Sequence, residues 1–302
     1  MSSLFKRQKI DVVFENAQFF GWRQDLPTIA WIPDFQHREL PQMFAWHGRW
    51  KRELGFIAQI FGQRFVMLSS EDARLACERY YPATQGRTRT VHFAVPPGAE
   101  IDYAAARNIA VDYALPEHFF FMPNQFWKHK NHALVAEALA ILRKRGKHIV
   151  VAASGMQNDP RNPEHFHRLQ ALVEHLGVRE EMRFLGLIPY SHLAALMQSC
   201  TALLNPSLFE GWSTTVEEAR SMGTPMLLSD LNVHREQMGD GAIFFDRYSA
   251  QALANAMQNF PVLSMEQRTI LANNAHRNAE TRIRRFGADF ADLTEAISVA
   301  RR

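Results

Sequence analysis

The chain has little cysteine, little excess charge and no long apolar run. Its two cysteines, Cys77 and Cys200, lie far apart in the sequence. This excludes a disulfide framework and a cysteine-based zinc site, and it indicates two small buried apolar residues. A net charge of +3 in 302 residues gives no argument for nucleic acid as the main partner. No stretch reaches the ~20 apolar residues of a membrane span, so we expect a cytoplasmic protein.

Two further absences concern the amino terminus and metal binding. The basic start MSSLFKRQK is followed by no apolar run, so it does not have the pattern of a secretory signal. Lys6, Arg7 and Lys9, with nearby Phe and Trp residues, leave open a peripheral contact with the inner face of a membrane. A solvated basic start is the favoured interpretation.

The sequence contains no Asp-x-Asp motif. Its 13 histidines are scattered, and those at positions 129, 132, 165 and 167 lack acid or thiol partners at metal-ligand spacing. We therefore expect no metal and no other cofactor.

What the sequence does contain is a regular alternation in its second half. Strand-length apolar runs occupy residues 119–122, 148–153, 183–185, 202–205, 226–229 and 242–245, and amphipathic stretches occupy 132–145, 163–176 and 191–199. Buried strands that alternate with helices predict parallel βαβ units and a doubly wound α/β domain. Ligands of such sheets bind outside the carboxyl ends of the strands.

The first half is less regular but also predicts α/β structure. Its expected strands are 10–14, 28–32, 65–68 and 90–94, and its expected helices are 46–61 and 71–80. Residues 96–116, with Pro96-Pro97-Gly98, predict a linker. The tail from Met265 predicts helix with a break at Gly287. The expected domains are 1–112, 113–275 and a carboxyl-terminal helix, 276–302, for which a return to the first domain is left open.

The most informative run extends from Asn205 to Pro225. Gly211 predicts a tight turn after a strand, and Ser213 or Thr214 can cap the following helix. Thr214 and Glu217 have the spacing of a capping box. The N–H groups from Gly211 to Thr215 would then point at an anion such as a diphosphate.

Two acids, Glu210 and Glu218, flank this helix start. A carboxylate beside a phosphate is unfavourable, so we expect both to face hydroxyl groups, as a ribose and a sugar ring supply. For Glu218, a first-turn acid favoured by the helix dipole is an equally weighted alternative.

The loop after the strand at 119–122 places Lys128 and Lys130 at the same sheet edge. A lysine there can neutralise a diphosphate leaving group, and two solvated lysines are the alternative.

Together these runs resemble the donor domain of glycosyltransferase family 4, the retaining nucleotide-sugar transferases of GT-B fold. The glutamate pair of that family falls on Glu210 and Glu218, and its Gly-Thr-Pro falls on 223–225. Phe184-Leu185-Gly186 matches the approach to the base-contacting position, here Ile188. The basic pair of the family falls on Asn124 and Lys130, so the arginine is missing and Lys128 is a candidate substitute.

The resemblance implies two Rossmann-like doubly wound domains that face each other across a cleft. Glu218 would bind the ribose, Glu210 would contact the transferred sugar, and Lys130 would stabilise the leaving group. Backbone donors to the diphosphate and sugar would come from Gly211, Trp212, Ser213 and Thr214. The implied activity is retaining, metal-independent hexosyl transfer from a UDP- or GDP-sugar to a glycan or glycolipid, as in cell-surface polysaccharide synthesis.

The amino-terminal half departs from this family. Asp34 and His37 follow a strand in a run that resembles cleft-facing acceptor segments, so His37 is a candidate for contacting the donor sugar or taking the acceptor proton. A structural histidine is the alternative. The first strand is followed by Glu15-Asn16-Ala17-Gln18 and not by a glycine-rich turn. This indicates a shortened, incomplete acceptor domain.

The shortened half leaves a second interpretation open: a donor-binding remnant without turnover, or a partner subunit. A sugar-nucleotide epimerase of the same fold would need acid and base residues from both domains, and the sequence offers no strong set of these.

Overall fold

The computed structural model describes residues 2–16, 19–22, 26–62, 64–96, 98 and 101–299. Its contacts divide the chain into two compact units. The first comprises Met1–Ala94, Glu210–Trp212 and Thr281–Arg302, and the second comprises Val95–Phe209 and Ser213–Glu280. The boundary by contacts thus lies at Ala94, upstream of the expected position 112.

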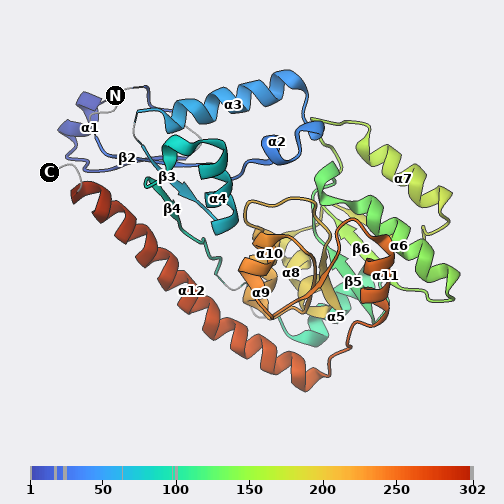
Figure 1. Cartoon of the computed structure of the whole chain (residues 1–302). Coiled ribbons are helices and arrows are strands. Elements are labelled where there is room, and N and C mark those ends of the chain that lie inside the picture. Colours follow the sequence, from blue (N-terminus) through green and yellow to red (C-terminus); the bar gives the residue numbers. More distant parts are fainter. Residues whose placement is uncertain are drawn as a thin grey trace. The chain divides into compact units, whose positions relative to one another are not determined.

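The first unit is built on a parallel sheet with the strand order β1-β2-β3-β4 (Figure 1). Its elements are α1 (Ser2–Arg7), β1 (Val13–Asn16), β2 (Thr28–Trp31), α2 (Gln36–Glu39), η1 (Pro41–Met43), α3 (Trp46–Ile60), β3 (Phe65–Leu68), α4 (Glu71–Tyr80), η2 (Pro82–Thr84) and β4 (Thr88–Thr90). The four expected strands are present, with bounds shifted by up to a few residues.

Alternating strand residues of this sheet enter two apolar clusters. Val66 and Leu68 pack with Phe35 and Phe56, in a cluster that includes residues of α3 and α4. Met67, on the other side of β3, packs in a cluster with Ile29 and with residues of the carboxyl-terminal helix. The period of two along a strand explains why one strand feeds both clusters.

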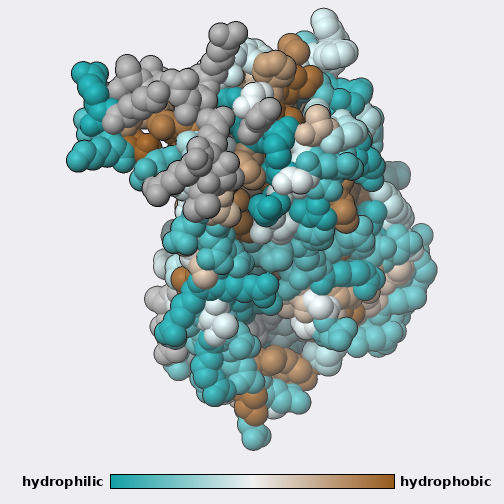
Figure 2. Space-filling model, turned by 60° about the vertical axis from the view of Figure 1, so that its left-hand side comes forward, coloured by the Kyte–Doolittle hydropathy of each residue, from teal (hydrophilic) through white to brown (hydrophobic). Residues whose placement is uncertain are grey.

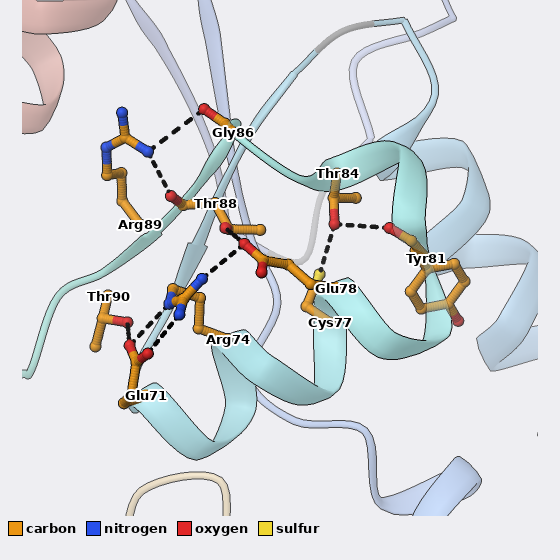
Figure 3. A network of polar contacts seen from close by, with 10 residues as sticks. All are labelled: Glu71, Arg74, Cys77, Glu78, Tyr81, Thr84, Gly86, Thr88, Arg89 and Thr90. Atoms are coloured by element: carbon orange, nitrogen blue, oxygen red, sulfur yellow. Dashed lines mark hydrogen bonds and ion pairs between the residues drawn. The ribbon is translucent and has the colours of Figure 1, made fainter.

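Polar contacts tie α4 to β4 (Figure 3). Arg74 forms ion pairs with Glu71 and, at 2.7 Å, with Glu78. Thr90 donates to Glu71 at 3.0 Å, and Thr88 donates to Glu78. Each acid therefore links a helix residue to a strand residue, which fixes the helix over the edge of the sheet.

Both cysteines are free and fully buried, as the sequence predicts. Burial raises the pKa of the Cys77 thiol to about 11 and that of Cys200 to about 12. Neither thiol is ionised near neutral pH, so both act as small apolar core residues.

The second unit is a parallel sheet with the strand order β10-β9-β8-β5-β6-β7. Its elements are α5 (Tyr103–Asp112), β5 (Phe119–Met122), η3 (Lys128–Lys130), α6 (His132–Lys144), β6 (Val150–Ser154), α7 (His165–His175), β7 (Met182–Gly186), α8 (Tyr190–Ser199), β8 (Ala202–Asn205), α9 (Thr214–Met222), β9 (Met226–Ser229), α10 (Asn232–Met238), β10 (Ile243–Phe245) and α11 (Ala250–Gln258). All six expected strands are confirmed.

Helices cover both faces of this second sheet (Figure 1). Phe120 and Met122 of β5 pack in a cluster with residues of α6, α7 and α11. Phe119 and Phe121 pack in the other cluster, with residues of α5, α8 and α9. A strand buried on both faces explains the uninterrupted apolar run Phe-Phe-Phe-Met.

Three expectations about the connections are corrected. Part of the predicted linker forms α5, which Asp102 caps by accepting from the backbone N–H groups of Ala104 and Ala105. The tail forms one helix, α12 (Met265–Val299), which passes through Gly287 without a break. A glycine in a helix costs about 1 kcal/mol but does not end the helix.

The third correction concerns Glu15, which lies within β1 and not in the loop after it. Its side chain is fully buried and pairs with Arg64, at 2.7 Å between Oε2 and Nε. Some positions discussed in the sequence analysis lie outside the described residues. They are Ala17 and Gln18 of the expected loop, Pro97 of the expected linker and the side chain of Lys6.

No helix in the described ranges is long and apolar enough to cross a membrane.

Two glycines give opposite predictions for stability. Gly223 ends α9 with φ +73°, and a Cβ there would lie 2.7 Å from backbone atoms of Leu271 and Ala272. We expect Gly223→Ala to destabilise the protein by about 2 kcal/mol or more. Gly287 is exposed with open space around it, so Gly287→Ala should stabilise by about 0.5–1 kcal/mol. Thermal melting by circular dichroism measures both, and shifts of the same sign would contradict the assignment.

Candidate functional site

The strand order of the second unit reverses between β5 and β8, which are neighbours in the sheet. The loops that follow these two strands leave the same sheet edge in diverging directions, which is the usual ligand position in a doubly wound fold. The backbone N–H of Leu208 donates to the carbonyl of His129 at 2.8 Å, so the two loops are joined directly. The loop that carries Lys128 and Lys130 and the loop that leads to α9 therefore lie side by side, as the sequence predicts.

Asn131 secures this junction. It has φ +58°, a left-handed conformation that asparagine tolerates. Its Nδ2 donates to the carbonyl of Pro206 at 3.2 Å and to that of Arg247 at 3.0 Å. One side chain thus connects the loops after β5, β8 and β10.

Ser213 is the cap of α9. Its Oγ accepts from the N–H of Val216 at 3.4 Å and from Nδ2 of Asn205 at 3.2 Å. Gln237 of α10 holds the Ser213 backbone from both sides: Oε1 accepts from the N–H, and Nε2 donates to the carbonyl, each at 3.1 Å. The Ser213 N–H, expected to face a ligand, is therefore used inside the protein.

The next two N–H groups are open. The backbone N–H groups of Thr214 and Thr215 have no acceptor in the part of the chain that the structure describes. They belong to the first turn of α9, where intrahelical partners are lacking and the helix dipole is positive. An anion at this point would receive two hydrogen bonds.

Glu218 lies on α9, one turn after the open N–H groups, and is half-buried. Its carboxylate has no hydrogen-bond partner among the described residues. Burial raises the pKa of Glu218. Burial, and then the charge of Glu218, raise the pKa of Tyr190, which places the carboxylate near the start of α8. A half-buried acid without a partner is costly and fits a ligand that brings hydroxyl donors.

The neighbouring Glu217 has a different structural explanation from the expected one. Ser213 is the cap, so the third helical position is Val216 and no Thr214–Glu217 capping box forms. Glu217 is buried and lies 3.7 Å from the guanidinium of Arg220. The capping-box prediction is wrong because the helix begins at Thr214, one residue earlier than that spacing requires.

The loop after β5 supplies three predicted site residues with different surroundings. Lys128 is exposed and Lys130 is half-buried, both on η3. Asn124 is 3% exposed, and its Nδ2 has no hydrogen-bond partner in the described ranges. A buried amide of this kind offers two donors to a ligand.

Ile188 lies in the loop between β7 and α8. Its side chain packs partly against the apolar cluster of α5, α8 and α9. No backbone hydrogen bond of Ile188 occurs among the described residues. Its N–H and C=O are available to a ligand, as the predicted base contact requires.

Glu210, Gly211 and Trp212 belong by their contacts to the first unit. The carbonyl of Gly211 accepts from Oγ of Ser70 at 2.8 Å. A Cβ on Gly211 would lie 2.2 Å from the carbonyl oxygen of Pro33. Close packing therefore requires a glycine at position 211, whose φ is not positive.

Trp212 is anchored by its indole. Its Nε1 donates to the carbonyl of Phe93 at 3.1 Å, and its ring stacks on His92 with 4.7 Å between centroids. Glu210 is half-buried. The tryptophan side chain thus fixes the segment that carries Glu210.

His37 lies on α2 and is fully buried. Its Nε2 lies 3.0 Å from Oε2 of Glu53, and burial lowers the pKa of His37. Oδ1 of Asp34 accepts from Arg52 at 2.8 Å. Both predicted residues are engaged in contacts within the first unit, and the catalytic role of His37 stays a prediction.

Sequence reasoning missed Asn131, Asn205 and Gln237. An asparagine just before a helix is a turn signal that could have indicated Asn131. Gln237 gives no local signal, because its partner Ser213 lies on a different loop. No group of three or more His, Cys, Asp or Glu residues able to hold a metal occurs in the described ranges.

The part of the chain that matches a known protein family corresponds mainly to the second unit. A model of the family described as "Glycosyl transferases group 1" matches residues 111–279. The O-antigen chain mannosyltransferase RfbU of Salmonella typhimurium is 24% identical over 147 residues, which are 49% of this chain and 39% of the relative. The matched part is therefore less than half of that relative's length.

Two solved structures share the fold across the chain. A glycosyltransferase from Rickettsia africae has a TM-score of 0.75 at 13% identity, over 98% of this chain and 79% of the other. Anabaena Alr3699/HepE, solved with UDP and glucose, has a TM-score of 0.73 at 16% identity, over 98% and 80%. The two parallel sheets are those of the GT-B fold.

The unpartnered carboxylate leads to a prediction about stability. The pKa of Glu218 is raised in the folded protein, so its ionisation opposes folding as the pH rises above the unfolded-state value near 4.5. Glu218→Gln should therefore raise the melting temperature by about 1–3 °C at pH 7.5. At pH 3, well below the pKa in either state, the gain should vanish. Glu180→Gln, an exposed acid, is the control, and equal gains for both variants at pH 7.5 would contradict the prediction.

Proposed function

Because the chain belongs to the family Glycosyl transferases group 1, we propose that it moves a hexose from a nucleotide-sugar donor to a glycan or glycolipid acceptor, with the anomeric configuration retained. The observation that carries the proposal is the half-buried Glu218 without a partner, one turn from the open N–H groups of Thr214 and Thr215. This arrangement matches a molecule that has phosphate and hydroxyl groups a few ångströms apart.

The donor would lie across the loops at the β5/β8 reversal. The diphosphate accepts hydrogen bonds from Thr214 and Thr215, at the positive end of α9. Glu218 accepts hydrogen bonds from the ribose hydroxyls, and the backbone of Ile188 pairs with the base. These contacts use the polar groups that the protein itself leaves unused.

The leaving group needs positive charge, because the departing nucleotide gains negative charge when the sugar bond breaks. Lys130 provides that charge, and exposed Lys128 can add to it. Asn124 occupies a position at which glycosyltransferase family 4, which this chain resembles, has an arginine. Its buried Nδ2 donates a hydrogen bond to the diphosphate in place of a charge. With these donors present, the reaction requires no metal ion.

Glu210 and the backbone of Gly211 and Trp212 contact the transferred sugar. The acceptor hydroxyl attacks on the face from which the diphosphate leaves, its oxygen bonds to the anomeric carbon as the old bond breaks, and its proton passes to the leaving phosphate. Both UDP- and GDP-sugars are candidate donors. HepE was solved with UDP and glucose, and RfbU is named as a mannosyltransferase of the O-antigen chain. The second name supports a role in cell-surface polysaccharide synthesis.

A donor-binding subunit without turnover is the second candidate. The first unit has four strands in its described sheet against six in the second, and the chain spans less than half of RfbU. Lys130 and the glutamate pair Glu210 and Glu218 favour the active enzyme, because a positive charge placed for the leaving nucleotide serves turnover and not donor binding alone.

A panel of UDP-, GDP- and ADP-sugars tests the proposal, with binding measured by thermal shift and turnover by nucleotide release. We expect stabilisation by at least one donor and release in the presence of glycan acceptors. Stabilisation without release across the panel would select the non-catalytic subunit. No stabilisation by any donor would refute both candidates.

Two substitutions test the assigned roles. Glu218→Ala should weaken donor binding about 10- to 100-fold, through loss of charged hydrogen bonds to the ribose. Lys130→Ala should slow nucleotide release about 100-fold with a smaller effect on binding, because its charge acts on the leaving group. Glu180→Ala and Lys144→Ala, at exposed positions, are the matched controls. Variants that behave as their controls would refute the roles.

A further inference from the structure

Helix α3 of the first unit carries an apolar stripe that faces solvent. The exposed fractions are 75% for Trp46, 59% for Trp50, 61% for Leu54, 39% for Ile57 and, just after the helix, 61% for Phe61. These positions follow one another at intervals of three and four residues, so they share one side of the helix. Other positions of the helix are buried, among them Phe56 and Ile60.

Two more aromatic residues extend the stripe. Trp22 is 55% exposed and contacts Phe61 edge to face at 5.7 Å, and Phe19 contacts Trp22 in the same way at 5.2 Å. We call the seven residues Phe19, Trp22, Trp46, Trp50, Leu54, Ile57 and Phe61 the α3 face. Teal hydrophilic residues dominate the side of the molecule shown in Figure 2, where brown residues form separate patches. An exposed, largely aromatic surface such as the α3 face marks an interaction site.

The charges on α3 have one sign where they reach solvent. Arg49 and Lys51 are exposed, and neither has an acidic partner among the described residues. The single acid of the helix, Glu53, is buried, with Oε2 3.0 Å from His37 and 2.7 Å from Nε of Arg38. The α3 face therefore has a cationic border and no exposed carboxylate on its own helix.

We propose that the α3 face is a membrane-docking surface, which enters the headgroup region of a bilayer that contains anionic lipid. Tryptophan is enriched at the membrane–water interface, because its ring is apolar and its N–H is polar. An amphipathic helix with aromatic residues on one face and basic residues beside them lies in that interface. A second copy of this chain fits less well, since a symmetric contact would bring two cationic borders together.

Vesicle sedimentation with the full chain tests this proposal. We expect binding to vesicles of phosphatidylcholine mixed with phosphatidylglycerol, weaker binding at high salt, and little binding to phosphatidylcholine alone. Brominated lipid should quench the tryptophan fluorescence. The double substitution Trp46→Ser/Trp50→Ser should lower vesicle affinity by about tenfold, through loss of apolar area in the interface. Arg49→Glu/Lys51→Glu should lower it by about tenfold or more.

Matched controls separate docking from general effects. Leu75→Ser removes an apolar side chain of 54% exposure from α4 of the same unit. Lys144→Glu/Lys147→Glu makes the same charge change at exposed positions elsewhere. Both should bind vesicles as the unmodified chain does, and thermal melting should show that all variants are folded.

Three results would overturn the proposal. The first is no binding to anionic vesicles, and the second is equal binding by the α3 variants and their controls. The third is a dimer in solution that Trp46→Ser/Trp50→Ser dissociates, which would assign the α3 face to a second copy. None of these readouts depends on sugar transfer, so the inference stands or falls apart from the proposed activity.

Discussion

The reversal of strand order between β5 and β8 is the constraint on which the candidate site depends. It forces the chain to leave two adjacent strands toward opposite halves of the sheet, and the space between the departing loops becomes available to a ligand. The bond from Leu208 to His129 and the two bonds from Asn131 keep those loops at a fixed separation. The loop that carries Lys130 and the loop that leads to α9, distant in sequence, are joined for this reason.

The polar groups around this point fall into two classes. Ser213, Asn205 and Gln237 satisfy one another and form a rigid frame. The backbone N–H groups of Thr214 and Thr215 and the carboxylate of Glu218 have no hydrogen-bond partner within the described chain. Such a division has a cost in stability, because open donors and a half-buried acid are unfavourable without a ligand. It also means that a bound donor meets groups already held in place, with little ordering still to be done.

Much of the fold was predictable because strands in the middle of the second sheet are short apolar runs buried on both faces, such as Phe119–Met122, Ala202–Asn205 and Met226–Ser229. The donor segment was predictable because glycine, capping and acidic residues have local rules. The features that the sequence did not predict depend on tertiary contacts. The close approach of Pro33 to Gly211, the clamp of Gln237 on Ser213 and the burial of His37 leave no mark at those positions in the sequence. Helix α5 was mistaken for a linker because two prolines and a glycine precede it.

The packing of the carboxyl-terminal helix has a consequence for folding during synthesis. Leu293 and Ile297, near its end, are buried in the first unit beside Ile29 and Met67. Ile29 is synthesised long before Ile297, so the first unit cannot complete this cluster until Leu293 and Ile297 have emerged from the ribosome. The second unit extends only to Glu280, so all of its residues emerge from the ribosome before Leu293 and Ile297. The second unit can therefore complete its core before the first, although it follows the first in the sequence, and the cluster around Ile29 stays incomplete until α12 has emerged.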